Sequence, residues 1–402
     1  MTTTASAERP ITTELNNVLS KEIRKEQGIY FTPTAIRNRL FEVIGRHISP
    51  SQSMRILEPS FGSGEFLYDA RERYSSANIV GVEKNKTIFD KVAANFTGAS
   101  VTLHNMDFLD FTESGFEVII GNPPYFTTTI KNPACMSGRG NIFVLFIYNC
   151  LTKHLAANGI LAFIIPTSFY NCLYYQACSD YIVNNTTILH VENMTGGGFY
   201  ETEQNTTLLV VRKAAPKTVD WTFNLHGRTY ISPNYKELTE IVAGATNLAS
   251  LGFSVKTGDV VWNQEKKNLH ETQGTLIIYA NNIVNNNIVL NNFAKRGGVA
   301  NEKKQRIKNY TREPVRGPAI VINRGYGNAN YKLSYALIPA TMEPFYGENH
   351  VNVITANNEE AKNNFTRILA SLADPRTTRF LSMFSGNNAL SKTELETMIP
   401  IF

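Results

Sequence analysis

The chain has 402 residues, of which 43% are hydrophobic and 18% are charged. This length and composition allow a full hydrophobic core and favour two domains over one. The N-terminal sequence MTTTASAERPITTELNNV lacks the apolar segment of a secretory signal, and the longest apolar tract, NIFVLFIYNCL, is too short to span a membrane. We therefore expect a cytoplasmic protein, of a cell or a virus, that is soluble, is not secreted and binds no membrane.

The cysteine pattern gives no sign of a metal site or a disulfide framework. The four cysteines, at positions 135, 150, 172 and 178, form no CxxC pair and have no histidine at the spacing of metal ligands. We therefore expect reduced thiols and no bound metal.

The net charge of +5 is unevenly distributed along the chain. It is −1 through residue 214 and +6 after it, and together these give the total. Eight basic residues fall within one stretch that contains only two acidic ones, and they are Lys295, Arg296, Lys303, Lys304, Arg306, Lys308, Arg312 and Arg316. Such a stretch is either a solvated surface loop or a surface that contacts the phosphates of a nucleic acid.

Short β-rich runs alternate with helical segments in the first half of the chain. Strands are predicted at 54–60, 77–85, 101–108 and 116–125, and helices at 64–75 and 86–96. A longer helix, 141–158, is predicted to end at Gly159, before further strands at 160–166, 188–194 and 206–213. This alternation indicates an α/β fold, in which helices cover both faces of a mostly parallel, twisted sheet.

The α/β pattern ends near Lys213. The segment AAPKTVD, residues 214–220, reads as a linker, and the sequence after it is rich in asparagine, interrupted by glycines and inclined to β-structure. We therefore predict two domains, a Rossmann-like domain over residues 1–214 and an α+β domain over residues 215–402.

Polar residues follow the first three predicted strands at the points where those strands end. The first strand leads into Glu58, Gly62 and Gly64, the second ends at Glu83, and the third ends at Asp107 and Phe108. Open parallel sheets bind ligands at the carboxyl ends of their strands, where an acidic residue after the second strand can accept both hydroxyls of a ribose. Taken singly, Glu83 could be a surface charge, Asp107 a helix cap and Phe108 a core residue. Because they stand in register on successive strands, together they predict a nucleoside pocket.

The first turn discriminates between two kinds of nucleoside ligand. A pyrophosphate requires neutral backbone donors at such a helix N-terminus, whereas this turn carries Glu58 and Glu65. An acidic turn favours a cation. The sequence therefore favours S-adenosylmethionine, which joins a nucleoside to an amino-acid group and a sulfonium centre, over a dinucleotide.

The fourth predicted strand ends in the turn GNPPYF, beside the expected methyl donor. Two consecutive prolines lack backbone donors, so the turn presents acceptors. If Asn122 Oδ1 and the Pro123 carbonyl accept the two hydrogens of an exocyclic amine, the nitrogen lone pair can be directed at the methyl group. Asn122 is neutral and cannot act as a general base, and Tyr125 could stack on the base.

These motifs resemble those of the S-adenosylmethionine-dependent adenine-N6 DNA methyltransferases of gamma order, the TaqI type. GIYFTP, LEPSFGSGEF and NPPY occur in the family's order over roughly residues 20 to 213. The resemblance implies a class I methyltransferase fold, catalytic roles for Asn122, Pro123, Tyr125 and Phe199, and base flipping in duplex DNA. It implies cofactor contacts from Tyr30, Thr32, Glu58, Ser60, Gly62, Gly64, Glu83, Lys84, Asp107, Phe108 and Asn122.

The family places an aromatic residue on the far side of the flipped base, before the last strand. GGGFYETEQ offers Phe199 for that position, and the adjacent Tyr200 is an alternative. Phe199 could instead have a structural role, as a hydrophobic side chain that fills the base of a loop. The triple glycine does not decide between the two rings.

The second predicted domain resembles the target-recognition domains of related modification enzymes in VKTGDVVW, VINRGYGNANYKL, FYGENHVNVI and LSKTELETMIPI. The resemblance implies a restriction-modification role, and no pattern indicates a nuclease domain, so any restriction endonuclease would be a separate protein. RNA adenine-N6 methyltransferases, protein-glutamine methyltransferases and a non-catalytic DNA-specificity protein stay open as alternatives. The recognition site and the oligomeric state do not follow from the sequence.

Overall fold

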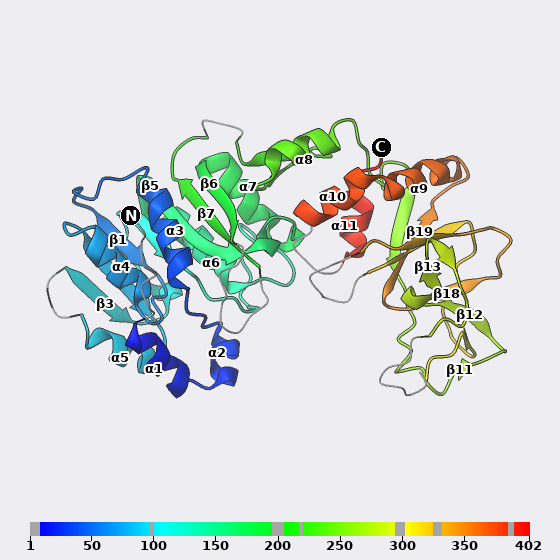
Figure 1. Ribbon diagram of the computed structural model, residues 1–402, viewed down its shortest axis with the longest axis horizontal. Coiled ribbons are helices and arrows are strands. Elements are labelled where there is room, and N and C mark those ends of the chain that lie inside the picture. The colour runs from blue at the N-terminus through cyan, green and yellow to red at the C-terminus, as the bar shows by residue number, and fades with distance from the viewer. Residues whose placement is uncertain are drawn as a thin grey trace. The chain divides into compact units, whose positions relative to one another are not determined.

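The computed structural model describes residues 9–96, 98, 100–194, 205–216, 220–293, 302–324, 332–384 and 390–402. The chain divides into two compact units (Figure 1), the first comprising Met1–Phe223 and Thr229–Lys236 and the second Asn224–Arg228 and Glu237–Phe402. The boundary between the two units lies at a hairpin of β8 (Thr222–Leu225) and β9 (Arg228–Ile231), and parts of this hairpin belong to each unit. The boundary expected from the sequence, after residue 214, lies shortly before this hairpin.

The first unit is built on a seven-stranded sheet with the strand order β3-β2-β1-β4-β5-β7-β6. The strands are β1 (Arg55–Glu58), β2 (Asn78–Glu83), β3 (Val101–Asn105), β4 (Phe116–Gly121), β5 (Leu155–Pro166), β6 (Thr187–Met194) and β7 (Thr206–Arg212). Neighbouring strands pair in parallel except β7, which runs antiparallel to both β5 and β6. This confirms the predicted mostly parallel sheet of an α/β fold.

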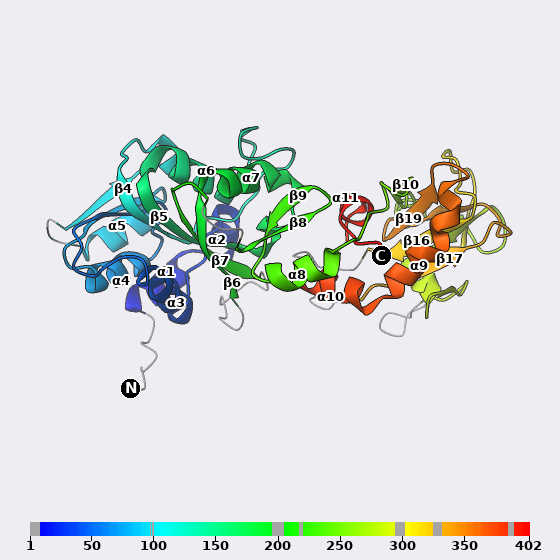
Figure 2. The ribbon, with the colours of Figure 1, turned by 90° about the horizontal axis from the view of Figure 1, so that it is seen from above.

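Helices cover both faces of this sheet (Figure 2). One face carries α1 (Pro10–Val18), α3 (Thr34–Ile44), α4 (Glu65–Arg73) and α5 (Lys86–Ala93), and the other carries α6 (Ile142–Asn149) and α7 (Gln176–Asn185). Alternate residues of the central strands, such as Ile56, Val118 and Ile120, pack with buried side chains of α1, α3, α4 and α5. The two-residue period of the strands therefore divides the core into two layers.

The long helix predicted at 141–158 is shorter in the structure. Helix α6 ends at Asn149 and continues as one π-helical turn, Cys150–His154, after which β5 begins at Leu155. Asn158 has a φ of 62°, which is left-handed and incompatible with a continuing helix. Because Leu155 already pairs with Phe116 of β4, the strand starts before Gly159.

The second unit is α+β, as predicted. One sheet has four antiparallel strands in the order β10-β19-β16-β17, and a second sheet of four shorter strands has the order β11-β15-β12-β18. The strands are β10 (Phe253–Thr257), β11 (Leu269–His270), β12 (Thr275–Ile278), β13 (Ile283–Val284), β14 (Asn287–Ile288), β15 (Arg306–Ile307), β16 (Ala319–Asn323), β17 (Tyr335–Ile338), β18 (Phe345–Gly347) and β19 (Val351–Ala356). The helices are α8 (Tyr235–Val242), which begins in the first unit, α9 (Phe365–Ala373), α10 (Pro375–Phe384) and α11 (Lys392–Thr397).

Within the described residues, no helix combines the length and the apolar character needed to cross a bilayer.

Candidate functional site

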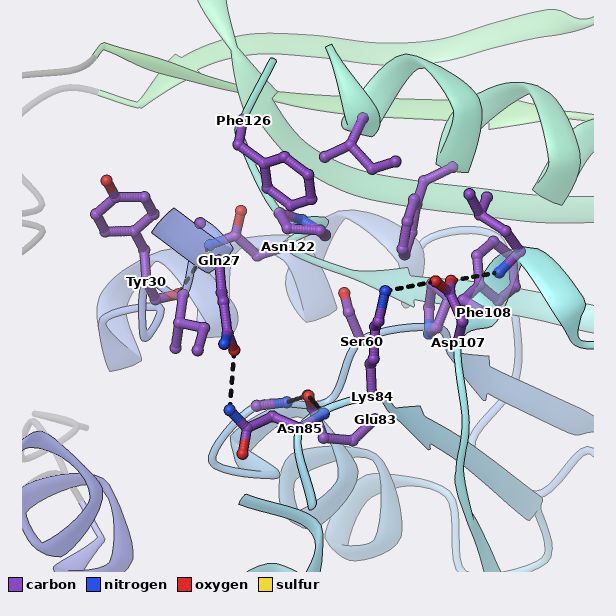
Figure 3. Close-up of a pocket in the computed structure, with 18 of the residues that line it drawn as sticks. Gln27, Tyr30, Ser60, Glu83, Lys84, Asn85, Asp107, Phe108, Asn122 and Phe126 are labelled. Carbon is purple, nitrogen blue, oxygen red and sulfur yellow. Dashed lines mark hydrogen bonds and ion pairs between the residues drawn. The ribbon is translucent and has the colours of Figure 1, made fainter. Parts of the chain in front are cut away.

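A cavity of about 600 Å³ lies at the carboxyl ends of β1, β2, β3 and β4 (Figure 3). Eight residues that the sequence assigned to the site line it, namely Tyr30, Ser60, Gly62, Glu83, Lys84, Asp107, Phe108 and Asn122. Five others do not line it, namely Thr32, Glu58, Gly64, Pro123 and Tyr125. Phe199 and its alternative Tyr200 lie outside the described residues.

Two unsatisfied polar atoms lie near the end of β1, one on Glu58 and one on the cavity residue Ser60. Glu58 is only 1% exposed, and its Oε2 has no hydrogen-bond partner among the described residues. Burial raises the pKa of Glu58 well above its usual value, and the nearby carboxylates of Glu83 and Asp69 add to the shift. Ser60 Oγ is also buried without a described partner and lines the cavity. Buried polar atoms normally have hydrogen-bond partners, so these two atoms are candidates for contacts with a ligand.

Glu83 lies at the end of β2 and organises the adjoining loops. Its Oε1 accepts the backbone N–H of Asn85 at 2.7 Å, and its Oε2 accepts the N–H of Gly62 at 3.1 Å. Burial raises the pKa of Glu83, while these backbone donors oppose the shift. Each carboxylate oxygen retains a further lone pair, so Glu83 can still accept the two hydroxyls of a ribose.

Asp107 has two partners in the structure. Its Oδ1 accepts the N–H of Leu109 at 2.9 Å and so caps the short 3₁₀ turn Phe108–Asp110. Its Oδ2 lies 2.8 Å from Lys84 Nζ, and Figure 3 shows this ion pair between two residues of the cavity lining. Asp107 is therefore the helix cap that the sequence left open as an alternative, and it also faces the cavity.

Apolar residues that sequence reasoning did not single out form part of the cavity wall. Phe126 follows the NPPY turn, and Ile142 and Phe146 belong to α6. The ring centroid of Phe146 lies 4.7 Å from that of Phe108, which is only 2% exposed. The sequence signal for Ile142 and Phe146 was the apolar run of α6, which reads as core, and the signal for Phe126 was its position directly after NPPY. Together these side chains make an apolar surface suited to a purine ring.

The two glycines before α4 have different surroundings. At Gly62, whose φ is 53°, an added Cβ would meet nothing closer than Phe31 at 3.8 Å, so a ligand can approach the backbone. At Gly64 the Cβ would lie 2.8 Å from Val92, so this glycine permits packing against α5.

Glu65 points away from the cavity into a buried ion network. Its Oε2 lies 2.6 Å from Arg9 Nη1 and 3.0 Å from Arg37 Nη2, and Thr12 Oγ1 donates to its Oε1 at 2.7 Å. Glu65 thus joins α1 and α3 to α4, and Glu58 is left as the acidic group of the turn with an oxygen that has no hydrogen-bond partner among the described residues.

The turn at the end of β4 holds Asn122 by its amide. Asn122 Nδ2 donates to the Tyr30 carbonyl at 3.2 Å and to Thr32 Oγ1 at 3.1 Å, while its Oδ1 accepts from the Tyr125 hydroxyl. That hydroxyl also lies 2.7 Å from the Ile164 carbonyl, and the Tyr125 ring stacks with Tyr30 at 6.3 Å. No hydrogen bond within the described chain ends on the carbonyl oxygens of residues 122–124.

The predicted basic stretch lies in the second unit, and most of its described cations have local partners. Lys304 pairs with Glu271, and Arg306 Nη1 and Nη2 lie 2.9 and 2.5 Å from the carboxylate oxygens of Glu343. Lys303 Nζ lies 4.9 Å from the ring centroid of Tyr279 and 5.4 Å from that of Trp262. Lys295 and Arg296 lie outside the described residues. The stretch is therefore partly neutralised.

The cavity residues fit S-adenosylmethionine by their chemistry. Glu83 suits ribose hydroxyls, and the ring wall with Asp107 suits an adenine and its amine. Glu58, which precedes the cavity residues Pro59 and Ser60, has a buried oxygen without a described partner that suits a cationic amino group.

Comparison with known proteins identifies the family. The family model of the Eco57I restriction-modification methylase matches residues 53–198. The chain is 31% identical over 396 residues to the type II methyltransferase M.CvrRI of Paramecium bursaria Chlorella virus XZ-6E, covering 97% of both chains. It is 34% identical over 251 residues to the modification methylase CviBIII of Paramecium bursaria Chlorella virus NC1A, covering 62% of this chain and 64% of that one.

Among solved structures, the methyltransferase subunit of the type I restriction-modification system of Streptococcus thermophilus is similar, with a TM-score of 0.36 and 16% identity over 54% of each chain. The match to M.CvrRI extends over both units, and the cavity of the first unit fits the methyl donor of such enzymes. The chain therefore belongs to the type II DNA methyltransferases of restriction-modification systems, which use S-adenosylmethionine as methyl donor.

Proposed function

We propose that this enzyme, of gamma order, methylates N6 of an adenine that is flipped out of duplex DNA. The observation that carries the proposal is the pair of acceptors at the end of β4, Asn122 Oδ1 and the Pro123 carbonyl. The adenine amine has two hydrogens and a lone pair that is delocalised into the ring. Two acceptors that bind both hydrogens draw the nitrogen toward tetrahedral geometry and expose the lone pair.

In this proposal, S-adenosylmethionine supplies an electrophilic methyl group on a sulfonium centre. Asn122 and Pro123 orient the amine, whose nitrogen would form a bond to the methyl carbon as the bond from that carbon to sulfur breaks. Because an amide is no base at neutral pH, the N6 proton would pass to solvent from the positively charged nitrogen after the transfer. Tyr125 forms one face of the slot for the base, and Phe199 or Tyr200 forms the other. These rings offset part of the few kcal/mol needed to unstack a base.

The cofactor contacts proposed for the first unit follow from the cavity. Glu58 and Ser60 bind the amino-acid part, Glu83 binds the ribose, and Asp107 accepts a hydrogen from the adenine amine beside Phe108. Gly62 permits close approach of the backbone. To make its contact, the adenine amine shares or displaces the ammonium group of Lys84 at Asp107.

Residues 215–402 are proposed to recognise the DNA target, and a restriction endonuclease that cuts the same site is proposed as a separate protein. The comparisons extend over this region, because the match to M.CvrRI spans 97% of the chain. The family relationship favours a DNA substrate over the RNA and protein-glutamine alternatives.

The test is to identify the methylated nucleoside. The purified protein is incubated with S-adenosylmethionine carrying a labelled methyl group and with unmethylated genomic DNA, which is then digested to nucleosides and separated by chromatography with mass detection. N6-methyldeoxyadenosine as the labelled product supports the proposal. Label in N4-methyldeoxycytidine or 5-methyldeoxycytidine would contradict it. In a parallel incubation with total RNA, label in the RNA and none in the DNA would exclude a DNA target.

A further inference from the structure

The orientation of the Asn122 amide is decided by the N-terminal segment of the chain. Asn122 Nδ2 lies 3.2 Å from the backbone carbonyl of Tyr30 and 3.1 Å from Thr32 Oγ1. A backbone carbonyl can only accept, so the atom facing Tyr30 must be the amide nitrogen. Its two hydrogens are then taken by Tyr30 and Thr32, and Oδ1 is turned toward the opposite side.

The opposite side of the amide retains acceptor capacity. The Tyr125 hydroxyl carries one hydrogen and has two acceptors in reach, Asn122 Oδ1 and the Ile164 carbonyl at 2.7 Å. When the Tyr125 hydroxyl donates to Ile164, both lone pairs of Oδ1 are available to a substrate amine. Rotation of the amide by 180° would instead present a donor to that amine.

The Tyr30 carbonyl decides this orientation, and Thr32 is held firmly enough to keep the amide in it. It is 6% exposed and does not line the cavity, and its carbonyl accepts Arg37 Nη1 at 2.6 Å. Arg37 is itself 2% exposed, and its Nε lies 2.7 Å from Asp69 Oδ2. Breaking a buried pair of this kind is costly, so the segment that carries Thr32 has little freedom to move.

We propose that Thr32 is a positioning residue for methyl transfer, which fixes the Asn122 amide with Oδ1 toward the substrate amine, rather than a contact to the cofactor. This inference rests on the proposed amine-methylating function and adds a residue that acts through Asn122. It departs from the role that the sequence resemblance implied for Thr32, because the hydroxyl is occupied by Asn122 and does not reach the cavity.

The experiment compares Thr32→Val, Thr32→Ser and the matched control Thr12→Val in the full-length protein. Valine keeps the shape of threonine without its hydroxyl, and serine keeps the hydroxyl. Thr12 is a second buried threonine of the N-terminal segment, 2% exposed, whose hydroxyl bonds Glu65 and not Asn122. Cofactor affinity is measured by titration calorimetry with S-adenosylhomocysteine, transfer by single-turnover kinetics on DNA, and folding by the thermal midpoint.

We expect Thr32→Val to slow single-turnover transfer about tenfold or more, the scale for losing one orienting hydrogen bond, with cofactor affinity changed less than about twofold. Thr32→Ser should restore most of the rate, and Thr12→Val should leave both quantities near those of the parent. Weakened cofactor binding at an unchanged rate in Thr32→Val would overturn the proposal in favour of a cofactor contact. An unchanged rate and affinity in Thr32→Val would overturn it as well. So would losses of rate in Thr32→Ser and Thr12→Val that equal the loss in Thr32→Val.

These outcomes are separate from a failure of the proposed function. That function fails if the parent enzyme places its methyl group on an atom other than adenine N6, whatever the Thr32 variants do.

Discussion

At the scale of single residues, the proposed site combines two kinds of side chain. Asn122 is neutral and orients the substrate amine, whereas Glu58 is a buried acid that binds a cationic group. Asn122 cannot take a proton, whereas the pKa of Glu58 is raised by burial and by neighbouring carboxylates. The two residues therefore respond differently to substitution and to pH, which separates transfer from cofactor binding.

Replacing Asn122 by alanine should affect transfer alone. We expect Asn122→Ala to lower turnover at least about a hundredfold, the scale for removing a preorganised polar group from a transition state, while cofactor and DNA binding stay near those of the parent. Steady-state kinetics, calorimetry and fluorescence anisotropy measure these three quantities. Near-parental turnover in this variant would exclude the proposed mechanism.

Glu58 should make cofactor binding depend on pH. Its pKa in the free protein is raised above the usual 4.5, so the neutral carboxyl is favoured as the pH falls below that raised value. A cationic ligand favours the carboxylate, so binding should release a proton, and affinity should rise with pH through this window and then level off. In the free protein the same group should stabilise the fold at low pH and lose that contribution as the pH rises. Calorimetry in buffers of different ionisation enthalpy measures the proton release, which Glu58→Gln should abolish.

The acids after β2 and β3 should differ in the cost of their removal. We expect Glu83→Ala and Asp107→Ala each to weaken cofactor binding by about 1 to 3 kcal/mol, the cost of deleting a partner of a buried polar group. Glu83 also holds the amides of Gly62 and Asn85, so its removal should in addition lower the thermal midpoint. Calorimetric affinities equal to that of the parent in both variants would mean that the cofactor binds elsewhere.

At the scale of elements, the end of helix α2 (Lys21–Gln27) packs against the catalytic turn. The helix ends at Gly28, whose φ is 63°, and a Cβ there would lie 2.7 Å from the backbone nitrogen of Tyr125. Gln27 accepts a hydrogen bond from Asn85 at 2.9 Å beside the cavity, as Figure 3 shows. Helix α2 therefore contributes both to the cavity wall and to the position of the NPPY turn.

Gly28→Ala should displace that turn. The substitution adds left-handed backbone strain of about 1 to 2 kcal/mol and a clash with the backbone of Tyr125, so turnover should fall at least about tenfold. Gly244→Ala is the matched control, because Gly244 has a φ of 73° but no atom within 4 Å of an added Cβ. A similar turnover in the two variants would show that contact with the turn is unimportant, and thermal midpoints measure the strain common to both.

At the scale of the whole molecule, the basic surplus of the second half is reduced by local ion pairs. Lys304 and Arg306 have carboxylate partners 33 and 37 residues away in sequence, and Lys303 is held between two rings. Lys308 instead contacts the neutral amide oxygen of Gln273. The residues of this stretch should therefore contribute unequally to DNA binding.

The salt dependence of DNA binding tests this difference. We expect Lys308→Ala to reduce the slope of log K against log salt by about 0.9 on cognate and non-cognate duplexes alike, because a phosphate contact releases counterions without reading sequence. Lys303→Ala should leave the slope unchanged and lower the thermal midpoint, since it removes a cation packed on Tyr279 and Trp262. Anisotropy titrations at several salt concentrations with S-adenosylhomocysteine present provide the slopes. Equal slopes for the parent and Lys308→Ala would remove Lys308 from the DNA interface.

The local pattern of the sequence by itself determined the order of strands and helices in the first unit and the residues that stand at the strand ends. Glu83, Asp107 and Asn122 could be assigned to one site because the carboxyl ends of parallel strands meet at one edge of a sheet. The same reasoning could not predict where the helix that contains α6 ends. The pairing of Leu155 with Phe116, which starts β5, depends on a strand that lies far back in the sequence.

Only the tertiary structure decided which partner each side chain takes. Thr32 faces Asn122, although the family resemblance had implied a contact to the cofactor. Glu65, which the sequence placed in the acidic turn, faces Arg9 and Arg37. Lys304, for which the sequence left open a phosphate contact or a solvated loop, faces Glu271. Strand periodicity repeats every two residues and can be read locally. A side chain's partner, in contrast, depends on which distant segment packs against it, and that is set by the fold as a whole.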